Sequence, residues 1–402
     1  MRLNIVVILL TVMIDGMGIG LILPVMPALI EDVQGGTLAQ AAIWGGILST
    51  TFAVMQFLFG PLLGSLSDTV GRRPVILVSL FVLGLDYLIM ALAGSVWFLL
   101  LGRILGGVTS ATYATASAYM ADISAPGEKA ANFGLVGAAF GAGFVAGPLI
   151  GGLLGEMGPR APFFAAAALA GLNGVFGLLV LKETVTDRIR RPFSWARANP
   201  FGAMRHIGRL PGLGPLLWVI LLYQLATNAY PAVWAYFTQA RFGWTPQVIG
   251  LSLGLYGITT ALVQGGMIRV LLRRWGERRT VILGHGFELC AFAAIIMVTW
   301  STGLLLLTPL AALGAIVMPA LQGLMAERVG DGEQGALQGV IVSVSALAMI
   351  LSPLVMTGIF AAFTRDTAAI HFPGAPFVLA GILVAAALIV FLRSAASVTS
   401  RH

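Results

Sequence analysis

Charged side chains are scarce in this sequence, which limits the kinds of protein it can encode. Only 10% of the 402 residues are Asp, Glu, Lys or Arg, whereas 58% are hydrophobic. A soluble globular domain carries roughly a quarter charged residues. A chain so depleted, with apolar runs repeated along nearly its whole length, is expected to lie in a lipid bilayer.

Cysteine is almost absent as well. Cys290 is the only one, which excludes an intramolecular disulfide and a metal site built from several cysteines. It lies in an apolar run, so we expect an inert thiol in the core. The net charge of +7 does not indicate a nucleic-acid partner, because the arginines are scattered over short loops instead of forming a soluble basic domain.

Apolar runs of about twenty residues, the length that spans a bilayer core, recur along the chain. The first starts at Leu3 without a small-residue cleavage pattern, so we expect a spanning helix and not a cleaved signal. We predict an all-α integral membrane protein with twelve transmembrane helices, at 3–30, 41–66, 74–94, 96–121, 132–155, 161–181, 213–239, 246–272, 279–300, 302–326, 335–363 and 375–393.

One long polar interval, 183–212, divides the chain. We predict a cytoplasmic linker there, with room for a short interfacial helix, between a six-helix bundle of 1–182 and another of 213–402. If both termini are cytoplasmic, the loops and tails on that side hold 19 of the 23 Lys and Arg residues. That distribution satisfies the positive-inside rule. The linker arginines are Arg188, Arg190, Arg191, Arg197, Arg205 and Arg209.

The two halves repeat each other in the same orientation. Glycine and proline anchors recur at an offset of 205, which indicates two six-helix bundles related by a pseudo-two-fold axis along the membrane normal. Parallel repeats of this kind are a transporter architecture, with the substrate site near the midplane between the halves. The matching anchors are Gly71 with Gly276, Gly127-Glu128 with Gly332-Glu333, Gly134 with Gly339, and Pro148 with Pro353.

The stretch Gly64–Pro74 places Asp68, Arg72 and Arg73 between two apolar runs. Such polar residues cannot lie in hydrocarbon, so we predict a tight turn at the cytoplasmic water boundary. A degraded copy, Gly266–Thr280, keeps arginines but has no aspartate at the matching place. We expect an Asp68–Arg72 contact that steadies one access state and that only the first copy makes.

Three acids interrupt predicted spans: Asp15, Asp86 and Glu288. A charge at the bilayer centre costs about 3 kcal/mol, so these side chains should face a bundle interior or a watery cavity. At 1.5 Å per residue, Asp15 and Asp86 lie roughly 20 Å and 18 Å above the inner ends of their helices, and Arg103 lies roughly 9 Å below its outer end. An Asp15/Asp86/Arg103 cluster is thus geometrically possible, and a purely structural ion pair is the alternative for Arg103.

Glu288 has no basic residue near it on its own helix, and His285 lies one turn earlier on the same face. A carboxyl removed from water binds a proton more readily, so we predict that Glu288 carries a proton or faces substrate. The amides within spans either contact a ligand or join helices. They are Gln56, Asn228, Gln264, Gln322 and Gln338.

Glycines at four-residue spacing surround Gly147 and Pro148. Such spacing lets another helix approach closely, and proline removes a backbone donor. We predict that this helix packs tightly against another helix and pivots at Gly147-Pro148. The alternative is a tight contact without motion.

These residues resemble the major facilitator superfamily, and within it the tetracycline–proton antiporters, over essentially the whole chain. The phrases that carry the resemblance are Gly64…Asp68…Gly71-Arg72-Arg73, Gly102-Arg103-Ile-Leu-Gly106-Gly107, the helix with Gly147-Pro148, Asp15-Gly-Met-Gly-Ile-Gly-Leu-Ile-Leu-Pro24, Leu85-Asp86-Tyr87, Arg241-Phe-Gly-Trp244, Pro319-Ala-Leu-Gln-Gly323 and Glu333-Gln-Gly-Ala-Leu-Gln-Gly339. Glu288 stands where these antiporters usually have Asp, Thr260 stands near the place of a His in some, and Thr69 replaces a usual Arg.

The resemblance implies the superfamily fold and an efflux antiporter in the bacterial inner membrane. It would exchange a tetracycline, as a divalent-metal chelate, for protons by alternating access. The resemblance implicates Asp15, Asp86 and Glu288 in the exchange and puts Gln56, Arg103 and Gln264 on the substrate path or in structural roles. It also implies a cytoplasmic gate at Asp68 and Arg72, with Asp122 as its companion.

We expect no enzymatic activity and no resident cofactor; the expected partners are the drug, protons and the lipid bilayer, with a monomer sufficient. Export of another amphipathic drug or metabolite is the alternative. A membrane receptor or enzyme is more distant, because the sequence has no Ser/His/Asp set, metal-ligand cluster or phosphate loop.

Overall fold

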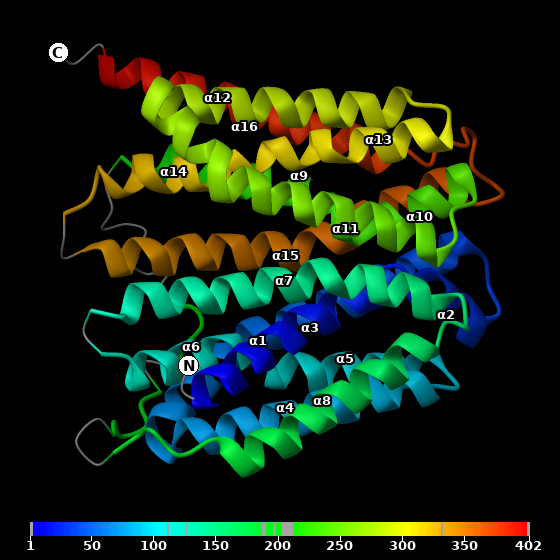
Figure 1. The fold of residues 1–402 in the computed structure, drawn as a ribbon. Helices are drawn as coiled ribbons and strands as arrows, with labels where there is room; N and C mark the ends of the chain where they lie inside the picture. Colours follow the sequence, from blue (N-terminus) through cyan, green and yellow to red (C-terminus); the bar gives the residue numbers. More distant parts are fainter. Residues whose placement is uncertain are drawn as a thin grey trace. The chain divides into compact units, whose positions relative to one another are not determined.

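The structure is a computed structural model that describes residues 3–110, 112–125, 127–186, 190–195, 198–202, 212–330 and 333–399. Within those ranges every regular element is helical (Figure 1). Long runs of apolar residues leave the backbone no solvent partner in a bilayer, and a helix satisfies its own hydrogen bonds. The predicted all-α fold is confirmed.

The helices of the first half of the chain are α1 (Leu3–Ile22), α2 (Met26–Gln34), α3 (Leu38–Val70), α4 (Arg72–Leu92), α5 (Val96–Thr109), α6 (Thr112–Ile123), α7 (Lys129–Gly155) and α8 (Ala161–Val180). Those of the second half are α9 (Gly214–Thr227), α10 (Ala229–Phe242), α11 (Pro246–Leu262), the π-helix η2 (Val263–Met267), α12 (Ile268–Met297), α13 (Ser301–Ala312), the 3-10 helix η3 (Leu313–Ile316), α14 (Val317–Ala326), α15 (Gln334–Thr364) and α16 (Ala375–Thr399).

Eleven stretches of the described chain are long and apolar enough to cross a membrane. One of them, Pro246–Met297, has 52 residues, or about 78 Å of helix, which is enough for two crossings. It turns at Gly276, whose φ of 71° and ψ of 173° are not helical. Twelve crossings result, as the apolar runs predicted.

Several predicted helices are interrupted. The first, expected to be continuous over 3–30, stops after Ile22 and resumes at Met26. Pro24 has no N–H for the helix ladder and its ring crowds the preceding turn, and Pro27 then sits at the start of α2, where proline is tolerated. Further breaks separate α5 from α6 and α9 from α10.

The predicted turn at Gly64–Pro74 is much shorter than expected. α3 continues to Val70 and α4 starts at Arg72, so Gly71 alone makes the turn. Its φ of 119° lies in the region that favours glycine. The polar residues of the stretch therefore lie on the last turns of one helix and the first turn of the next.

The chain forms two compact units, and each is described by itself. Unit 1 comprises Met1–Gly36, Leu48–Pro200 and Trp244–Gly254, and unit 2 comprises Thr37–Ile47, Phe201–Gly243 and Leu255–His402. In the linker predicted at 183–212, the described residues 183–186, 190–195 and 198–202 form no helix. Its Arg188, Arg197, Arg205 and Arg209, like the repeat anchor Gly332, lie outside the described residues.

Glycines bring α7 against α1 in unit 1 (Figure 1). A methyl group at Gly147 would overlap the carbonyl oxygen of Met17 and lie 2.9 Å from the backbone nitrogen of Leu21. On α1, a methyl group at Gly20 would lie 2.6 Å from Cδ of Pro148. Gly147 and Pro148 thus lie where two helix backbones meet, as the glycine spacing predicted.

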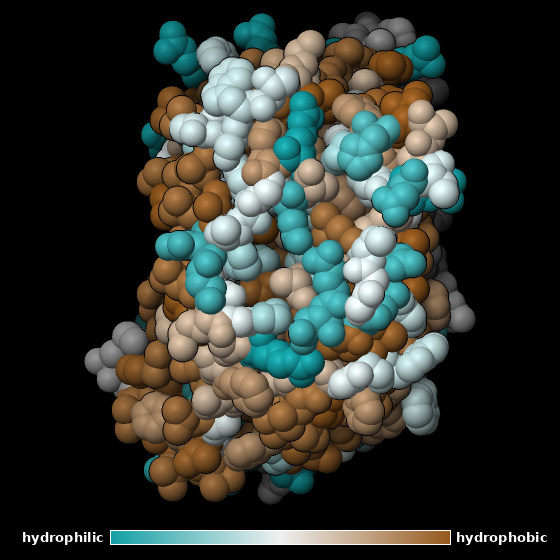
Figure 2. All heavy atoms as spheres, turned by 90° about the vertical axis from the view of Figure 1, so that its right-hand side faces the viewer, coloured by the Kyte–Doolittle hydropathy of each residue, from teal (hydrophilic) through white to brown (hydrophobic). Residues whose placement is uncertain are grey.

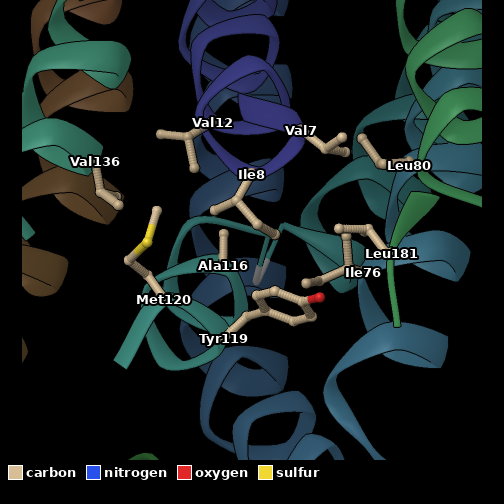
Figure 3. Packing of buried hydrophobic residues seen from close by; sticks show 10 residues of the cluster. All are labelled: Val7, Ile8, Val12, Ile76, Leu80, Ala116, Tyr119, Met120, Val136 and Leu181. Atoms are coloured by element: carbon tan, nitrogen blue, oxygen red, sulfur yellow. The ribbon is translucent and has the colours of Figure 1, made fainter. Parts of the chain in front are cut away.

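A hydrophobic cluster lies between α1, α4, α6 and α7 (Figure 3). The ring of Tyr119 on α6 is fully buried beside Ile8 and Ile76, and its hydroxyl donates to the carbonyl of Lys182 at 2.9 Å. The cluster therefore ties α1, α4 and α6 to the chain that leaves α8. Its members are Val7, Ile8, Val12, Ile76, Leu80, Ala116, Tyr119, Met120, Val136 and Leu181.

Unit 2 has an aromatic core. Tyr230 stacks on Phe292 with ring centroids 5.3 Å apart, and Phe237 meets Phe377 edge to face at 5.0 Å. Such pairs add to the free energy gained from burying their area. The core ties α10 to α12 and α16.

The outer faces of the helices carry large apolar side chains. Leu262, Leu306 and Leu172 are 69%, 73% and 68% exposed, as expected where lipid and not water is the surrounding medium. Figure 2 shows one face on which hydrophilic residues gather in a band with hydrophobic ones beside it. Cys290 is exposed on α12, so the expectation of a core thiol was wrong: in a membrane protein an apolar run has a lipid-facing side as well as a core.

Replacing Gly147 with Ala is expected to lower the free energy of unfolding by about 1–3 kcal/mol, because the added methyl group meets backbone atoms that cannot move aside. Gly141→Ala is the matched control on the same helix, since nothing lies within 4 Å of its added methyl group. Unfolding of both variants in detergent, followed by tryptophan fluorescence, tests this. Equal stability of the two variants would contradict a close α1–α7 contact.

Candidate functional site

Asp86 and Arg103 form a buried ion pair inside unit 1. Arg103 Nη2 lies 3.0 Å from Asp86 Oδ2, and the side chains are only 11% and 1% exposed. The guanidinium also donates to Sδ of Met90 at 2.6 Å and stands 5.3 Å from the ring centroid of Phe52 on α3. Arg103 therefore offsets most of the cost of the buried carboxylate.

Two glycines of α5 make room for that carboxylate. A methyl group at Gly102 would lie 2.7 Å from Asp86 Oδ1, and one at Gly106 would overlap Oδ2. Among the described residues, neither Asp86 Oδ1 nor Arg103 Nε has a hydrogen-bond partner. The pair thus keeps one acceptor and one donor for a ligand or a proton.

Asp15 lies on α1 and is partly exposed. Tyr87, next to Asp86, interacts electrostatically with Asp15, Asp86 and Arg103. Its hydroxyl lies against Gly18, where any side chain would overlap it. The structure therefore brings Asp86 and Arg103 together directly, and it packs Tyr87, the neighbour of Asp86, against α1 at Gly18, three residues after Asp15.

Glu288 is the buried acid of unit 2, 1% exposed on α12. Its carboxyl interacts with Tyr230 of α10, but in the described chain neither Oε1 nor the Tyr230 hydroxyl has a hydrogen-bond partner of good geometry. No described Lys or Arg forms a salt bridge with it. In the described part of the chain, this acid thus lacks the salt bridge that Asp86 has.

His285 lies one turn before Glu288 and is fully buried. Its Nδ1 is 2.8 Å from the carbonyl oxygen of Val281, and its ring centroid is 5.5 Å from that of Tyr223. Nε2 has no partner among the described residues. His285 is thus held by its own helix and shares the wall of the Glu288 site.

The predicted amide residues are distributed over several elements. Gln264 is exposed within the π-helix η2, and Gln56 on α3 and Gln322 on α14 are partly exposed. Asn228 donates from Nδ2 to the carbonyl of Gln224 at 2.7 Å, one turn back at the α9–α10 joint. The amide of Asn228 is therefore bonded to the last turn of α9.

The end of unit 1 at the Gly71 turn carries an ion network. Arg72 Nη1 lies 2.5 Å from Asp68 Oδ1, and Nε lies 3.4 Å from Asp122 Oδ2. Thr184 also donates to Asp122, at 3.0 Å. Asp68, Arg72 and Asp122 are thus in contact, and the chain after α8 joins them.

Glu183 is a member of this network that the charge pattern did not indicate. Its carboxylate accepts from the backbone N–H groups of Arg72 at 2.9 Å and Arg73 at 3.2 Å, so it caps the positive end of α4. A side chain at Gly71 would overlap it. An acid placed directly after a predicted span was the available signal, but its target lies 110 residues earlier.

The second copy of the turn lacks this network. Gly276 again has positive φ, but no atom lies within 4 Å of an added methyl group. Arg273 and Arg274 are exposed, and no described acid forms a salt bridge with either. The two copies share the turn and differ in its ion pairs.

Twelve apolar crossings with ionisable side chains buried inside them define a multi-pass membrane protein of the transporter class. The chain belongs to the major facilitator superfamily, whose model matches residues 8–353 and 216–401. It is 40% identical over 357 residues to the class C tetracycline resistance protein of Escherichia coli, covering 89% of each chain. It is also 40% identical to the class G protein of Vibrio anguillarum, over 90% of this chain and 91% of that one.

Among solved structures, the human organic anion transporter MFSD10 (TETRAN) superposes with a TM-score of 0.69 at 25% identity. The match covers 96% of this chain and 98% of that one. The predicted superfamily fold is thus confirmed by sequence and by structure.

Breaking the buried pair with Arg103→Met is expected to cost about 3–5 kcal/mol, because it leaves the buried carboxyl of Asp86 without its partner. The double variant Asp86→Asn/Arg103→Met should recover most of that loss, since it buries no charge. Free energies of unfolding for both single variants and the double variant measure the coupling.

The control is the exposed pair Arg160–Asp32, with side chains 34% and 49% exposed, whose loss should cost at most about 1 kcal/mol. A coupling at Asp86–Arg103 no larger than at this exposed pair would contradict a buried ion pair.

Proposed function

We propose that this protein is a proton-coupled exporter of tetracyclines in a bacterial inner membrane. The observation that carries the proposal is the pair of buried acids with opposite surroundings, Asp86 beside a cation and Glu288 without one. A buried carboxyl without a cation is far more stable neutral than charged, so it is suited to bind and release a proton. The names of the similar resistance proteins support a tetracycline as the substrate.

The chemistry of exchange rests on charge. A tetracycline chelated to a divalent metal is a cation, and Asp15, Asp86 and Glu288 are the intramembrane carboxyls that would attract it. Protonation of a carboxyl removes that attraction, so proton and drug bind alternately. Proton entry is coupled to drug export if a carboxylate that binds neither proton nor drug prevents the transition between inward-facing and outward-facing states. Such an unpaired charge is costly in the membrane.

The polar amides have a place in this scheme. Gln56 and Gln264, with Gln322, would give hydrogen bonds to the polar edge of the drug, while His285 supports the Glu288 site from its own helix. Asn228, bonded to Gln224, positions the α9–α10 joint. The metal travels with the drug, so no resident cofactor is required.

The ion network at the Gly71 turn serves as a cytoplasmic latch. Asp68, Arg72 and Asp122 steady one access state, and Glu183 holds the start of α4 in place beneath them. The α1–α7 contact at Gly147 and Pro148 lets α7 pack and pivot. Both termini would lie in the cytoplasm, an orientation supported by the positive-inside rule, because it puts 19 of the 23 basic residues on that side. A monomer would suffice for the cycle.

Drug uptake into everted membrane vesicles should depend on an acidic interior. We expect accumulation of tetracycline with Mg²⁺ when the pH gradient is imposed, and loss of accumulation when a protonophore collapses it. Vesicles without the protein give the background. Uptake that continues at the same rate after the collapse would rule out proton coupling.

Asp15→Asn and Glu288→Gln should abolish resistance to tetracycline in growing cells, because each removes a titratable carboxyl while keeping side-chain size. Asp32→Asn, at the exposed pair with Arg160, is the matched control and should protect like the wild type. Resistance is measured against tetracycline and a panel of other amphipathic drugs. If cells with the wild-type protein resist only other drugs, tetracycline is not the substrate. If both variants protect fully, Asp15 and Glu288 are not part of the transport path.

A further inference from the structure

The carboxyl of Glu288 occupies a recess that exists because residue 314 has no side chain. A methyl group added at Gly314 would overlap Oε2 and lie 2.9 Å from Cδ of Glu288. Glu288 is 1% exposed, so its carboxyl cannot turn into open space to avoid that overlap.

The backbone that forms the recess is fixed from the other side. Tyr223 of α9 donates from its hydroxyl to the carbonyl of Gly314 at 2.8 Å in a buried hydrogen bond. Gly314 belongs to η3, and Ile316 in the same segment is fully buried in a cluster with Val263 and Ile268. A larger residue at 314 would therefore displace Glu288 and not the backbone.

Gly314 lies in a 3-10 segment, Leu313–Ile316, in the middle of a crossing. A stretch of 3-10 helix within a longer helix often marks a functional hinge or a strained sequence. Nearby, a methyl group at Gly284 would lie 2.5 Å from Val317 Cγ2, so α12 and α14 also touch closely. The acid thus has neighbours on the sides toward α9, α10 and η3.

The first half of the chain positions its acid differently. Asp86 lies against glycines too, but Arg103 holds its carboxylate by an ion pair at 3.0 Å. No described Lys or Arg forms a salt bridge with Glu288, so the shape of the recess at Gly314 is what places its carboxyl. Side-chain length then matters: glutamate extends about 1.5 Å further than aspartate, one C–C bond.

We propose that Gly314 is a positioning residue that fixes the required length of the acid at 288, so that glycine pairs with glutamate and alanine would pair with aspartate. This inference rests on the proposed role of Glu288 in proton-coupled export. The space between positions 288 and 314 is fixed. A methyl group added at position 314 must therefore be matched by a side chain at position 288 that is shorter by one methylene group.

The test compares tetracycline uptake by Gly314→Ala, Glu288→Asp and the double variant Glu288→Asp/Gly314→Ala in vesicles. We expect Gly314→Ala to lower the initial rate on the order of 10-fold to 100-fold, the scale for an active group misplaced by about 1 Å. The double variant should transport better than Gly314→Ala and at least as well as Glu288→Asp. The pH profile of uptake should shift in Gly314→Ala and return toward that of Glu288→Asp in the double variant.

Gly286→Ala is the matched control, because it adds the same methyl group two residues from Glu288 where no atom lies within 4 Å. It should keep the wild-type rate and pH profile. Membrane content and melting temperature of every variant separate transport from folding. If the Gly314→Ala protein does not accumulate in the membrane, the double variant alone tests the inference. The inference then requires that the double variant both accumulates and transports tetracycline.

Each outcome has one meaning. Wild-type transport by Gly314→Ala, with Glu288→Gln inactive, would overturn the inference and leave the proposed function standing. A double variant that folds but transports no better than Gly314→Ala would also overturn it. Wild-type transport by Glu288→Gln would instead overturn the role of Glu288 on which the inference rests.

Discussion

The cost of a charge removed from water governs this structure. An isolated ion in a low-dielectric interior is so unfavourable that it must be paired, protonated or placed at the membrane surface. The chain places its acids in three different settings: Asp86 is paired with Arg103, Glu288 is buried without a salt bridge to any described Lys or Arg, and the Asp68–Arg72–Asp122 network lies at a turn between spans. Acids in these three settings respond differently to a proton or a cationic ligand. The cost of a buried charge can therefore drive different steps of one transport cycle.

Glycine supplies the geometry that this constraint requires. Asp86 rests on Gly102 and Gly106, Glu288 on Gly314, and the Glu183 carboxylate on Gly71. In each case the carboxylate lies so close to the glycine backbone that any side chain at the glycine position would overlap it. The 51 glycines of the chain would be costly in soluble helices, where glycine is destabilising by roughly 0.5–1 kcal/mol relative to alanine. In a membrane, close approach restores part of that loss through packing.

Sequence reasoning predicted the features set by local chemistry. Runs of apolar residues determined the crossings, and the buried acids and the Asp68–Arg72 pair followed from charges placed where lipid should be. It did not predict Glu183, Tyr223, Tyr230 or Gly314, because their roles depend on partners tens to more than a hundred residues away. It also extended the first helix through Pro24 and buried Cys290: hydropathy measures whether a residue avoids water, but not whether it faces protein or lipid, nor where a helix bends.

The interruptions of the helices then connect to the chemistry. Gln264 lies in the π-helix η2, Gly314 in the 3-10 helix η3, and Asn228 at the joint of α9 and α10. Each interruption departs from regular α-helical bonding within a crossing, where an unsatisfied group is costly. Side chains add hydrogen bonds at two of these places: Tyr223 donates to the carbonyl of Gly314, and Asn228 donates to the carbonyl of Gln224. The second half thus places its buried acid against η3, a segment that leaves regular α-helical form in the middle of a crossing and is held there by Tyr223.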